Sequence, residues 1–376
     1  MMRFIKTIYR LFKYRAEWSK QIREIQIRKD QAQDITKLNS TTDRLIVFFI
    51  PGAEYQSGKE AISGGLISIV SLAEESRKLF SEDPSTEVVC CTYFGDHLLF
   101  KLTSFENSTS IFEYSQLPKY FKNVSSIILH VPELFVEDFC NNRFQELNYD
   151  PEIVQLNILN QNINLMPSDK VIKGLKKKVN GLTITTAHKK YCTPAFQTKY
   201  DVPLHLLSVW ISPEKYIRYN FSEKKDLILF SPDNPSLTDQ IIQLIQLKLP
   251  QFQTRVINGL SYEQYKDLIR EAKFVITTGE GLDAYFIETY FSGGIGIAIK
   301  NEDFFDEKYL SLPALFNDFE LVGEKLISKI EEINEPQTYF RLNNELVQLL
   351  TQDYSSENYR MNLHKFYFNK YTYPYN

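Results

Sequence analysis

Cysteine and histidine are both scarce in this chain of 376 residues, which contains five histidines and four cysteines. The cysteines form no Cys-x-x-Cys pair, and no group of cysteine and histidine has the spacing of a metal site. We therefore expect buried thiols in a reducing compartment, no bound metal and no cofactor. The four cysteines are Cys90, Cys91, Cys140 and Cys192.

Long apolar runs and an excess of basic charge are missing as well. No run of about 18 apolar residues occurs, so no segment is expected to span a membrane. The first residues carry too many charges for the apolar part of a signal peptide. The net charge of −4 gives no overall basic signature for nucleic acid. We expect a cytoplasmic protein that does not bind nucleic acid.

The chain does contain enough apolar sequence for two packed domains. The apolar fraction is 43%, and a length of 376 residues suits two domains of ordinary size. Buried strands alternate with helical patterns on both sides of residue 212, which predicts an α/β protein with two doubly wound, Rossmann-like domains. The predicted strands are 45–50, 87–93, 124–131, 153–159, 182–186, 204–210, 227–230, 254–257, 274–276 and 295–299.

The first 30 residues differ from the rest of the chain. They contain nine basic and three acidic residues, hence a charge of +6, and Ile5, Ile8, Tyr9 and Phe12 follow helical spacing. A basic amphipathic helix with aromatic residues is typical of an anchor that lies in the surface of an anionic membrane. A helix that packs on its own domain or on a partner fits the pattern equally well. Residues 31–42 are polar and are predicted to form a linker.

Residues 274–299 have the pattern of a strand, a glycine turn, a short helix, a second glycine turn and another strand. Gly279 and Gly281 flank Glu280, and the helical pattern begins at Asp283. Glycines at the carboxyl end of a strand let the backbone approach a ligand, and the helix N-terminus offers free N–H groups to an anion such as a pyrophosphate. Open parallel sheets present their ligand sites in this way.

Seven residues separate Glu280 from Glu288, and Ser292 and Gly293 follow the second glutamate. This pattern resembles that of the GT-B glycosyltransferases, in particular the large retaining family usually called family four. In that family the first glutamate faces the donor sugar and the second binds the nucleotide ribose. An ordinary helix with a solvated carboxylate is the alternative. The resemblance implies that Glu280 is catalytic and that the donor is bound by Gly279, Glu280, Gly281, Leu282, Asp283 and Glu288.

The resemblance also implies a fold and a mechanism. GT-B proteins have two Rossmann-like domains that face a cleft, and their helix dipoles and basic side chains can serve the pyrophosphate without a metal. The family usually places an arginine and a lysine after the first strand of the second domain. Here that loop, residues 231–240, holds no basic residue, and Ser231 is its donor-binding candidate. The phosphate charge must then be met by the helix N-terminus near Asp283, by Arg255 or by Lys189.

Two histidines at strand ends are further candidates. His130 ends the apolar strand 124–131, and a histidine near this point of retaining GT-B enzymes often contacts the donor sugar, which makes His130 a catalytic candidate. A core histidine is the alternative. His188 and Lys189 follow the strand at 182–186 and are candidates for contact with the donor phosphate. A charged helix end is the more usual explanation for that pair.

Two polar or glycine-rich turns complete the candidate set. Residues 160–162 are Asn, Gln and Asn after a predicted strand, and three amides can hydrogen-bond sugar hydroxyls or cap and turn the chain. Gly64 and Gly65 open the first helix after the basic segment. They resemble the GT-B loop that approaches donor and acceptor, so they are acceptor-side candidates, with a tight turn as the alternative.

These observations predict four segments and one activity. The segments are a basic helix and linker at 1–42, an acceptor-side domain at 43–211, a nucleotide-sugar domain at 212–350 and a C-terminal segment at 351–376 that can cross back to the first domain. The expected activity is transfer of a hexose-like sugar from a nucleotide sugar to a lipid-linked or surface-polysaccharide acceptor, at the cytoplasmic face of the membrane. A non-catalytic GT-B-like binding or scaffolding protein at the membrane is the alternative.

Overall fold

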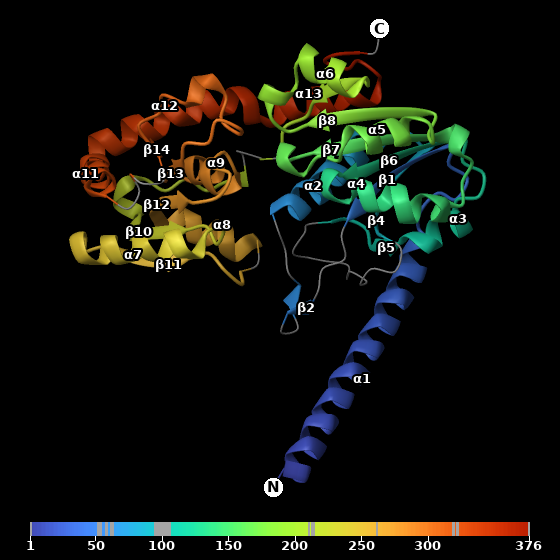
Figure 1. Cartoon of the computed structure of the whole chain (residues 1–376), viewed down its shortest axis with the longest axis horizontal. Coiled ribbons are helices and arrows are strands. Elements are labelled where there is room, and N and C mark those ends of the chain that lie inside the picture. Colours follow the sequence, from blue (N-terminus) through green and yellow to red (C-terminus); the bar gives the residue numbers. More distant parts are fainter. Residues whose placement is uncertain are drawn as a thin grey trace. The chain divides into compact units, whose positions relative to one another are not determined.

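The computed structural model describes residues 2–50, 55–56, 59–60, 64–93, 107–209, 211, 215–260, 262–317, 320 and 323–374. Within the first helix it describes the side chains of residues 14, 15, 18, 19, 21, 22 and 24 onward, so the predicted stripe Ile5, Ile8, Tyr9 and Phe12 lies outside the described side chains. The chain is an α/β protein with two parallel sheets, as predicted (Figure 1).

The first sheet has seven strands, in the order β5-β4-β1-β6-β7-β8-β9. Its interior strand β1 (Arg44–Ile50) runs parallel to β4 (Thr86–Thr92) on one side and to β6 (Ser126–Pro132) on the other. Six of the seven residues of β1 are buried, as expected for a strand of a parallel sheet covered on both faces. The other strands are β5 (Ile111–Glu113), β7 (Val154–Asn160), β8 (Gly181–Thr186) and β9 (Leu204–Leu206).

The described residues of this half of the chain form helices α1 to α6, and α2 buries Leu66, Ile69 and Val70. A short antiparallel pair, β2 (Tyr55–Gln56) and β3 (Lys59–Glu60), lies between β1 and α2 in the sequence. The helices are α1 (Met2–Ile35), α2 (Gly64–Leu79), α3 (Leu117–Tyr120), α4 (Val136–Asp138), α5 (Asp169–Lys176) and α6 (Pro194–Tyr200).

Helix α1 continues into the segment that was predicted to be a linker. It ends at Ile35. Gln31 is only 1% exposed, and its side-chain amide donates a hydrogen bond to the Ile111 carbonyl at 2.6 Å. Ile27 and Asp34 are buried with it, and the Asp34 carboxylate accepts a 2.5 Å hydrogen bond from Ser110. The prediction of a linker was wrong for residues 31–35, because the polar side chains of Gln31 and Asp34 make their hydrogen bonds inside the fold.

The second sheet has five parallel strands, in the order β11-β10-β12-β13-β14. Alternate residues of its strands pack on opposite faces, so that Ile228 and Phe274 join one apolar cluster while Leu227 and Val275 join another. The sheet is therefore doubly wound. Its strands are β10 (Lys225–Phe230), β11 (Gln253–Val256), β12 (Ala272–Thr277), β13 (Ile295–Ile299) and β14 (Leu315–Phe316).

Helices cover both faces of this second sheet. Helix α8 supplies Tyr265, Leu268 and Ile269 to the cluster that contains Leu227, whereas α7, α9, α11 and α12 contribute to the larger cluster. The helices of this half of the chain are α7 (Pro235–Lys248), α8 (Tyr262–Glu271), α9 (Ala284–Phe291), α11 (Glu324–Ile333), α12 (Pro336–Tyr354) and α13 (Ser356–Tyr367), and α13 contacts β9 instead.

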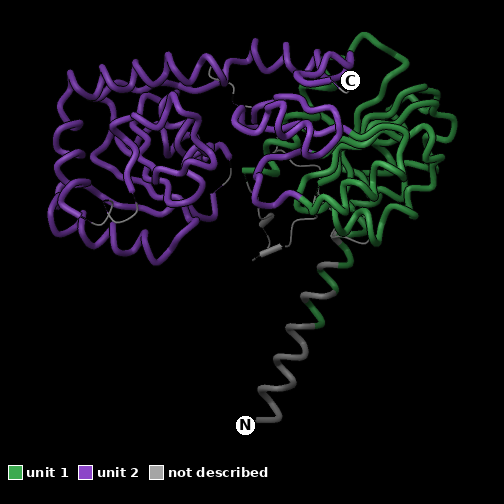
Figure 2. Tube along the Cα trace, turned by 45° about the horizontal axis from the view of Figure 1, so that its top comes forward, with its two compact units in different colours: residues 1–158, 167–182 green, residues 159–166, 183–376 purple. Residues whose placement is uncertain are grey.

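The chain divides into two compact units, coloured separately in Figure 2. The first comprises residues 1–158 and 167–182, and the second comprises residues 159–166 and 183–376. These bounds do not coincide with the boundary predicted at residues 211 and 212, because the second unit also includes the end of β7, most of β8, α6 and β9.

The C-terminal segment contacts β9 within the second unit. Tyr373 forms an antiparallel bridge with Leu204, and the Asn362 carbonyl lies 2.8 Å from Nε2 of the buried His205. Within residues 351–374, the C-terminal segment thus returns to a strand of the seven-stranded sheet. Among the described residues, no helix is both long and apolar enough to cross a membrane.

Candidate functional site

The turn between β12 and α9 is built by glycine and by a capping aspartate. All six residues of β12 are buried, and the polar turn begins directly after the strand. Gly281 has φ of +90°, a conformation that L side chains rarely adopt. Asp283 then caps α9: its carboxylate accepts from the Phe286 N–H at 2.9 Å and from the Thr277 hydroxyl at 2.6 Å.

A cavity of about 450 Å³ lies at this turn, inside the second unit. Its size is within the usual range for small-molecule sites. Three carboxylates, three amides and two aromatic rings line it, which suits hydrogen bonding to hydroxyl groups and packing on a ring. The lining residues are Asn162, Asn164, Asp233, Gly279, Glu280, Asp283, Tyr285, Asn301 and Phe304.

Glu280 stands in the wall of this cavity and is held by an amide. The Asn162 side chain donates a hydrogen bond to Oε1 of Glu280, and the side-chain Oδ1 of Asn162 in turn accepts from the Asn164 N–H at 2.9 Å. Burial raises the pKa of Glu280, Asp233 adds to that rise, and the Asn162 hydrogen bond opposes it. Asn162 belongs to the predicted run of amides after β7, so two sequence candidates meet here.

Neighbouring carboxylates affect the pKa of Asp283. Burial raises the pKa of Asp283 to about 7, against the hydrogen bonds from Thr277 and Phe286, and the charges of Asp233 and Glu280 raise it further. Asp233 lies against the glycine turn, since a Cβ added to Gly279 would sit 2.7 Å from its Oδ2. Gly279, Glu280 and Asp283 were all predicted from the sequence, whereas Asp233 was not.

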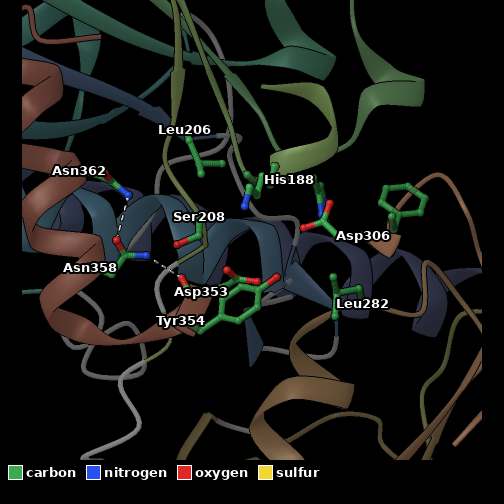
Figure 3. Close-up of a pocket in the computed structure, with 12 residues that line it drawn as sticks. His188, Leu206, Ser208, Leu282, Asp306, Asp353, Tyr354, Asn358 and Asn362 are labelled. Atoms are coloured by element: carbon green, nitrogen blue, oxygen red, sulfur yellow. Dashed lines mark hydrogen bonds between the residues drawn. The ribbon is translucent and has the colours of Figure 1, made fainter. Parts of the chain in front are cut away.

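His188 lies at a smaller cavity of about 30 Å³, shown in Figure 3. Its ring is 8% exposed and edge-on to Phe304, with 5.3 Å between ring centroids, and its Nδ1 has no hydrogen-bond partner. Burial lowers the pKa of His188 to about 4, so the ring is neutral at pH 7. The lining residues are Ala187, His188, Lys189, Leu206, Ser208, Leu282, Phe304, Asp306, Asp353, Tyr354, Asn358 and Asn362.

The two cavities share Phe304, so the predicted residues His188, Lys189 and Leu282 lie beside the larger cavity. The smaller space is large enough for one or two water molecules, which can hydrogen-bond to Nδ1 of His188. The predicted pair after β8 therefore lines a cavity that adjoins the one containing Glu280, within one unit.

His130 has a different environment. It is fully buried, its ring stacks on Phe48 with 4.2 Å between centroids, and its Nδ1 accepts from the Asn157 amide at 3.0 Å. Burial lowers its pKa to about 3. These contacts do not support the predicted catalytic role of His130. The residue belongs to strand β6, and its ring packs on β1 with no exposed surface that a sugar could contact. The core-histidine alternative fits them.

We expect His130→Gln to reduce the acid sensitivity of the fold. The unfolded chain binds a proton at this histidine below about pH 6.5, whereas the folded chain binds it only near pH 3. The free energy of unfolding therefore falls as the pH falls from 6.5 toward 3. Between pH 7 and pH 5 this one group should cost about 2 kcal/mol of unfolding free energy. Urea unfolding at both pH values measures the difference. His364→Gln, at an exposed site, should keep the full acid sensitivity, and an unchanged difference in His130→Gln would contradict the assignment.

Glu288 is buried below the cavity wall and is not among the lining residues. It is 4% exposed, and the Tyr262 hydroxyl donates to its Oε1 at 3.3 Å, whereas its Oε2 has no partner. Burial raises its pKa, and the hydroxyls of Tyr216, Tyr265 and Tyr262 oppose the rise. The alternative of a solvated carboxylate is therefore wrong. The predicted contact with a ribose stays a prediction.

The remaining candidates have structural environments. The Ser231 hydroxyl is fully buried and accepts from the Thr278 N–H at 3.1 Å, so it ties the end of β10 to the turn after β12. Gly64 and Gly65 are exposed at the start of α2, and a Cβ on Gly64 would meet no atom within 4 Å. Arg255 is exposed and does not line the larger cavity.

Sequence reasoning missed Asn164, Asp233, Tyr285, Asn301 and Phe304 among the residues that line the larger cavity. Asp233 follows β10 and Asn301 follows β13, so both stand past the carboxyl ends of parallel strands. That position was a usable signal, because such strand ends gather at one edge of a sheet. Phe304 comes from the longer loop after β13, and no periodic pattern marked it.

Solved structures provide the comparison with known proteins. Two structures of Anabaena Alr3699/HepE align with 86% of this chain. The one in complex with UDP and glucose has a TM-score of 0.58 and 10% identity over 98% of its length. The one in complex with UDP-glucose has a TM-score of 0.59 and 9% identity over 99% of its length.

Two trehalose-phosphate synthases are similar as well. OtsA, a trehalose-6-phosphate synthase, aligns over 87% of this chain and 98% of its own with a TM-score of 0.53 and 8% identity. The UDP-forming enzyme of Burkholderia xenovorans, in complex with glucose 6-phosphate, aligns over 86% and 99% with a TM-score of 0.51 and 8% identity. The chain has the GT-B fold.

The GT-B fold confirms the predicted fold class. At this level of identity the similarity establishes the fold and not the family, so the resemblance to family four stays a prediction. No family model matches the sequence, and no curated protein matches it at the sequence level.

Proposed function

We propose that this protein transfers a sugar from a nucleotide sugar to an acceptor and that the cavity at the start of α9 holds the donor. One observation carries the proposal: Glu280, the first glutamate of the predicted pair, stands on the glycine turn in the cavity wall of a GT-B fold. Proteins of this fold with UDP-glucose or with UDP and glucose bound support the donor class.

The lining residues divide the work in this proposal. The amides of Asn164 and Asn301 and the carboxylate of Asp233 hydrogen-bond the sugar hydroxyls, and Tyr285 or Phe304 packs on a ring. Glu280, fixed by Asn162, faces the reacting sugar, where a negative charge stabilises the positive charge that develops at the anomeric carbon. Glu288 accepts a hydrogen bond from a ribose hydroxyl after one of the surrounding tyrosines gives up its own hydrogen bond to this carboxylate.

The donor phosphates require positive partners, and none of the described residues that line the larger cavity is basic. Lys189, which lines the adjoining cavity, is the proposed cationic partner of the leaving group, and the neutral ring of His188 beside it supplies a hydrogen bond. A metal-independent transfer of a hexose fits these residues. We further propose that the acceptor is a lipid-linked or surface polysaccharide and that the protein works at the cytoplasmic face of a membrane.

A panel of nucleotide sugars tests the donor assignment. UDP-, GDP- and dTDP-linked hexoses are added to the whole protein, and thermal unfolding is followed. A ligand present at 100 times its dissociation constant adds about 2.7 kcal/mol to the free energy of unfolding. We expect one nucleotide series to raise the melting temperature. A flat response to every donor would contradict the proposed function.

A non-catalytic binding protein is the second candidate. The lining of the larger cavity, as far as the described residues form it, contains no basic residue, and this favours a binding protein because pyrophosphate binding is then weaker. The two candidates differ in one assay. Slow hydrolysis of the bound donor, detected as free nucleoside diphosphate, supports the transferase, whereas a donor that raises the melting temperature and is never cleaved supports the binding protein.

Helix α1 carries the observation that supports a membrane partner. Tyr14, Trp18, Ile22 and Ile25 follow helical spacing and are each more than half exposed, at 67%, 69%, 53% and 54%. At about 100° per residue, Ile27 projects from the opposite face, and it is buried in unit 1. The aromatic and aliphatic stripe is thus left exposed on a segment with a charge of +6, which fits an anionic lipid surface.

We expect the double variant Trp18→Glu and Ile22→Glu to bind vesicles that contain phosphatidylserine at least about tenfold more weakly than the parent, because two buried contacts with lipid are lost. Vesicle sedimentation measures the binding. A control with Ser19→Glu and Gln21→Glu adds the same charge at exposed polar positions and should lose less. Equal binding by the first variant and the parent would contradict the membrane proposal.

A further inference from the structure

The N-terminus of α9 is already occupied by a carboxylate of the chain itself. Asp283 accepts the Phe286 N–H at 2.9 Å, and this N–H is one of the free groups that a helix N-terminus offers to an anion. The Thr277 hydroxyl holds its second oxygen at 2.6 Å. A pyrophosphate that approaches α9 from the cavity therefore meets a negative charge in the place where it would accept hydrogen bonds.

The surroundings of Asp283 add to the conflict. Asp233, on the loop after β10, and Glu280, on the same turn, both face it, and Tyr285 on α9 is the other titratable group in the cavity lining. The described lining contains no lysine, arginine or histidine that could offset these carboxylates. A nucleoside diphosphate carries several negative charges of its own, so an ionised carboxylate that occupies the N-terminus of α9, beside the phosphates, weakens its binding.

We propose that Asp283 decides when this site accepts a donor: as a carboxylate it keeps the pyrophosphate away from α9, and as a neutral acid it admits it. This inference rests on the proposed function, because it concerns the same cavity. The neutral acid keeps one hydroxyl that can donate to a phosphate oxygen, and the loss of its charge frees the helix dipole for the ligand.

Donor binding is then coupled to uptake of a proton. Burial and the two neighbouring carboxylates raise the pKa of Asp283 to about 7, so both forms are populated near neutral pH. An anion bound beside the carboxyl raises this pKa further, because binding of the anion and binding of the proton favour each other by the same factor. Above the pKa of the free protein, affinity should therefore fall by up to about tenfold for each pH unit.

Calorimetric titration of the whole protein with UDP, GDP and dTDP tests the inference, carried out at pH 6, 7 and 8. Two buffers of different ionisation enthalpy count the protons taken up. The parent should bind its preferred nucleotide about fivefold more weakly at pH 8 than at pH 7 and take up close to one proton at pH 8. The terminal phosphate itself titrates near pH 6, and the variants below share that contribution.

Asp283→Asn removes the charge and keeps a side chain that caps helices well. It should bind the nucleotide at pH 8 at least about tenfold more tightly than the parent and lose the dependence between pH 7 and 8. Asp169→Asn, at an exposed position in the first turn of α5, is the matched control and should behave as the parent.

The outcomes separate this inference from the proposed function. A parent that binds a nucleotide with equal affinity at pH 7 and 8, or takes up no proton, overturns the role of Asp283 and leaves the donor site standing. An Asp283→Asn variant with the parent's pH dependence does the same. Absence of binding by the parent and by Asp283→Asn at every pH overturns both.

Discussion

Replacement of Glu280 by glutamine is expected to lower the rate of sugar transfer about a hundredfold or more while nucleoside diphosphate binding changes little. The substitution keeps the shape of the side chain and removes its charge. A group that stabilises charge in the transition state typically contributes a factor of about 10² to 10³ to the rate. The bare nucleoside diphosphate lacks the sugar that Glu280 faces, so its affinity should be nearly normal. Turnover and calorimetry together measure the two effects.

Two further variants make this result specific. Glu331→Gln, at an exposed position of α11, should keep full activity and controls for the change of charge. Asn162→Ala removes the amide that donates to Glu280 and should lower turnover by a smaller factor, because the carboxylate remains but is free to turn away. Full activity of Glu280→Gln would remove Glu280 from the reaction.

Gly281→Ala is expected to destabilise the fold by roughly 2 kcal/mol or more. The residue has φ of +90°, where a side chain is strained by about 1–3 kcal/mol. The added Cβ would also sit 2.6 Å from Cε2 of Phe305 and 2.7 Å from the Ile299 carbonyl oxygen. Because Phe305 is buried and Ile299 ends β13, neither neighbour can move freely. Urea unfolding measures the change in free energy.

The control for this prediction is Gly64→Ala. A Cβ at Gly64 meets no atom within 4 Å, and the residue is exposed at the first position of α2, so stability should change by less than about 1 kcal/mol. Nucleotide binding adds a second test of Gly281→Ala. The turn at Gly281 sets the positions of both Glu280 and Asp283, so binding should weaken along with stability. A variant as stable as the parent would contradict the structural role of the turn.

The fold could be predicted from the sequence because its strands are unbroken apolar runs. Residues 45–50 and 274–276 were both placed correctly inside β1 and β12, since strands covered on both faces leave a continuous apolar signature. The short edge strands β5 and β14 were missed. They have three and two residues, which is too few for a periodic pattern, and pairing with a neighbour determines them.

The site was predictable where local chemistry fixes it. Gly281 needs a positive φ and Asp283 caps a helix, so both can be read from a single stretch of sequence. Asn162 could be named as a polar strand-end residue, but its contact with Glu280 spans 118 positions and depends on tertiary packing. The same limit explains Asp233, whose place against Gly279 no local pattern encodes.

The two histidines show why a strand-end rule needs the exact end of the strand. His130 was placed at the end of an apolar run, yet β6 continues to Pro132, and His130 pairs in register with Phe48 of β1. It is a strand residue and is buried. His188 follows β8, which ends at Thr186, and it reaches a polar cavity. One or two residues beyond the strand thus separate a core position from a site position.

Hydrogen exchange of the whole protein with and without UDP-glucose tests the central claim most directly, because it locates the ligand on the chain. The donor cavity at the start of α9 predicts slower exchange of amides in residues 278–291 when the donor is present, with little change in α5 of unit 1. Protection confined to segments that do not line this cavity, or no protection at saturating UDP-glucose and at the other donors of the panel, would contradict the account.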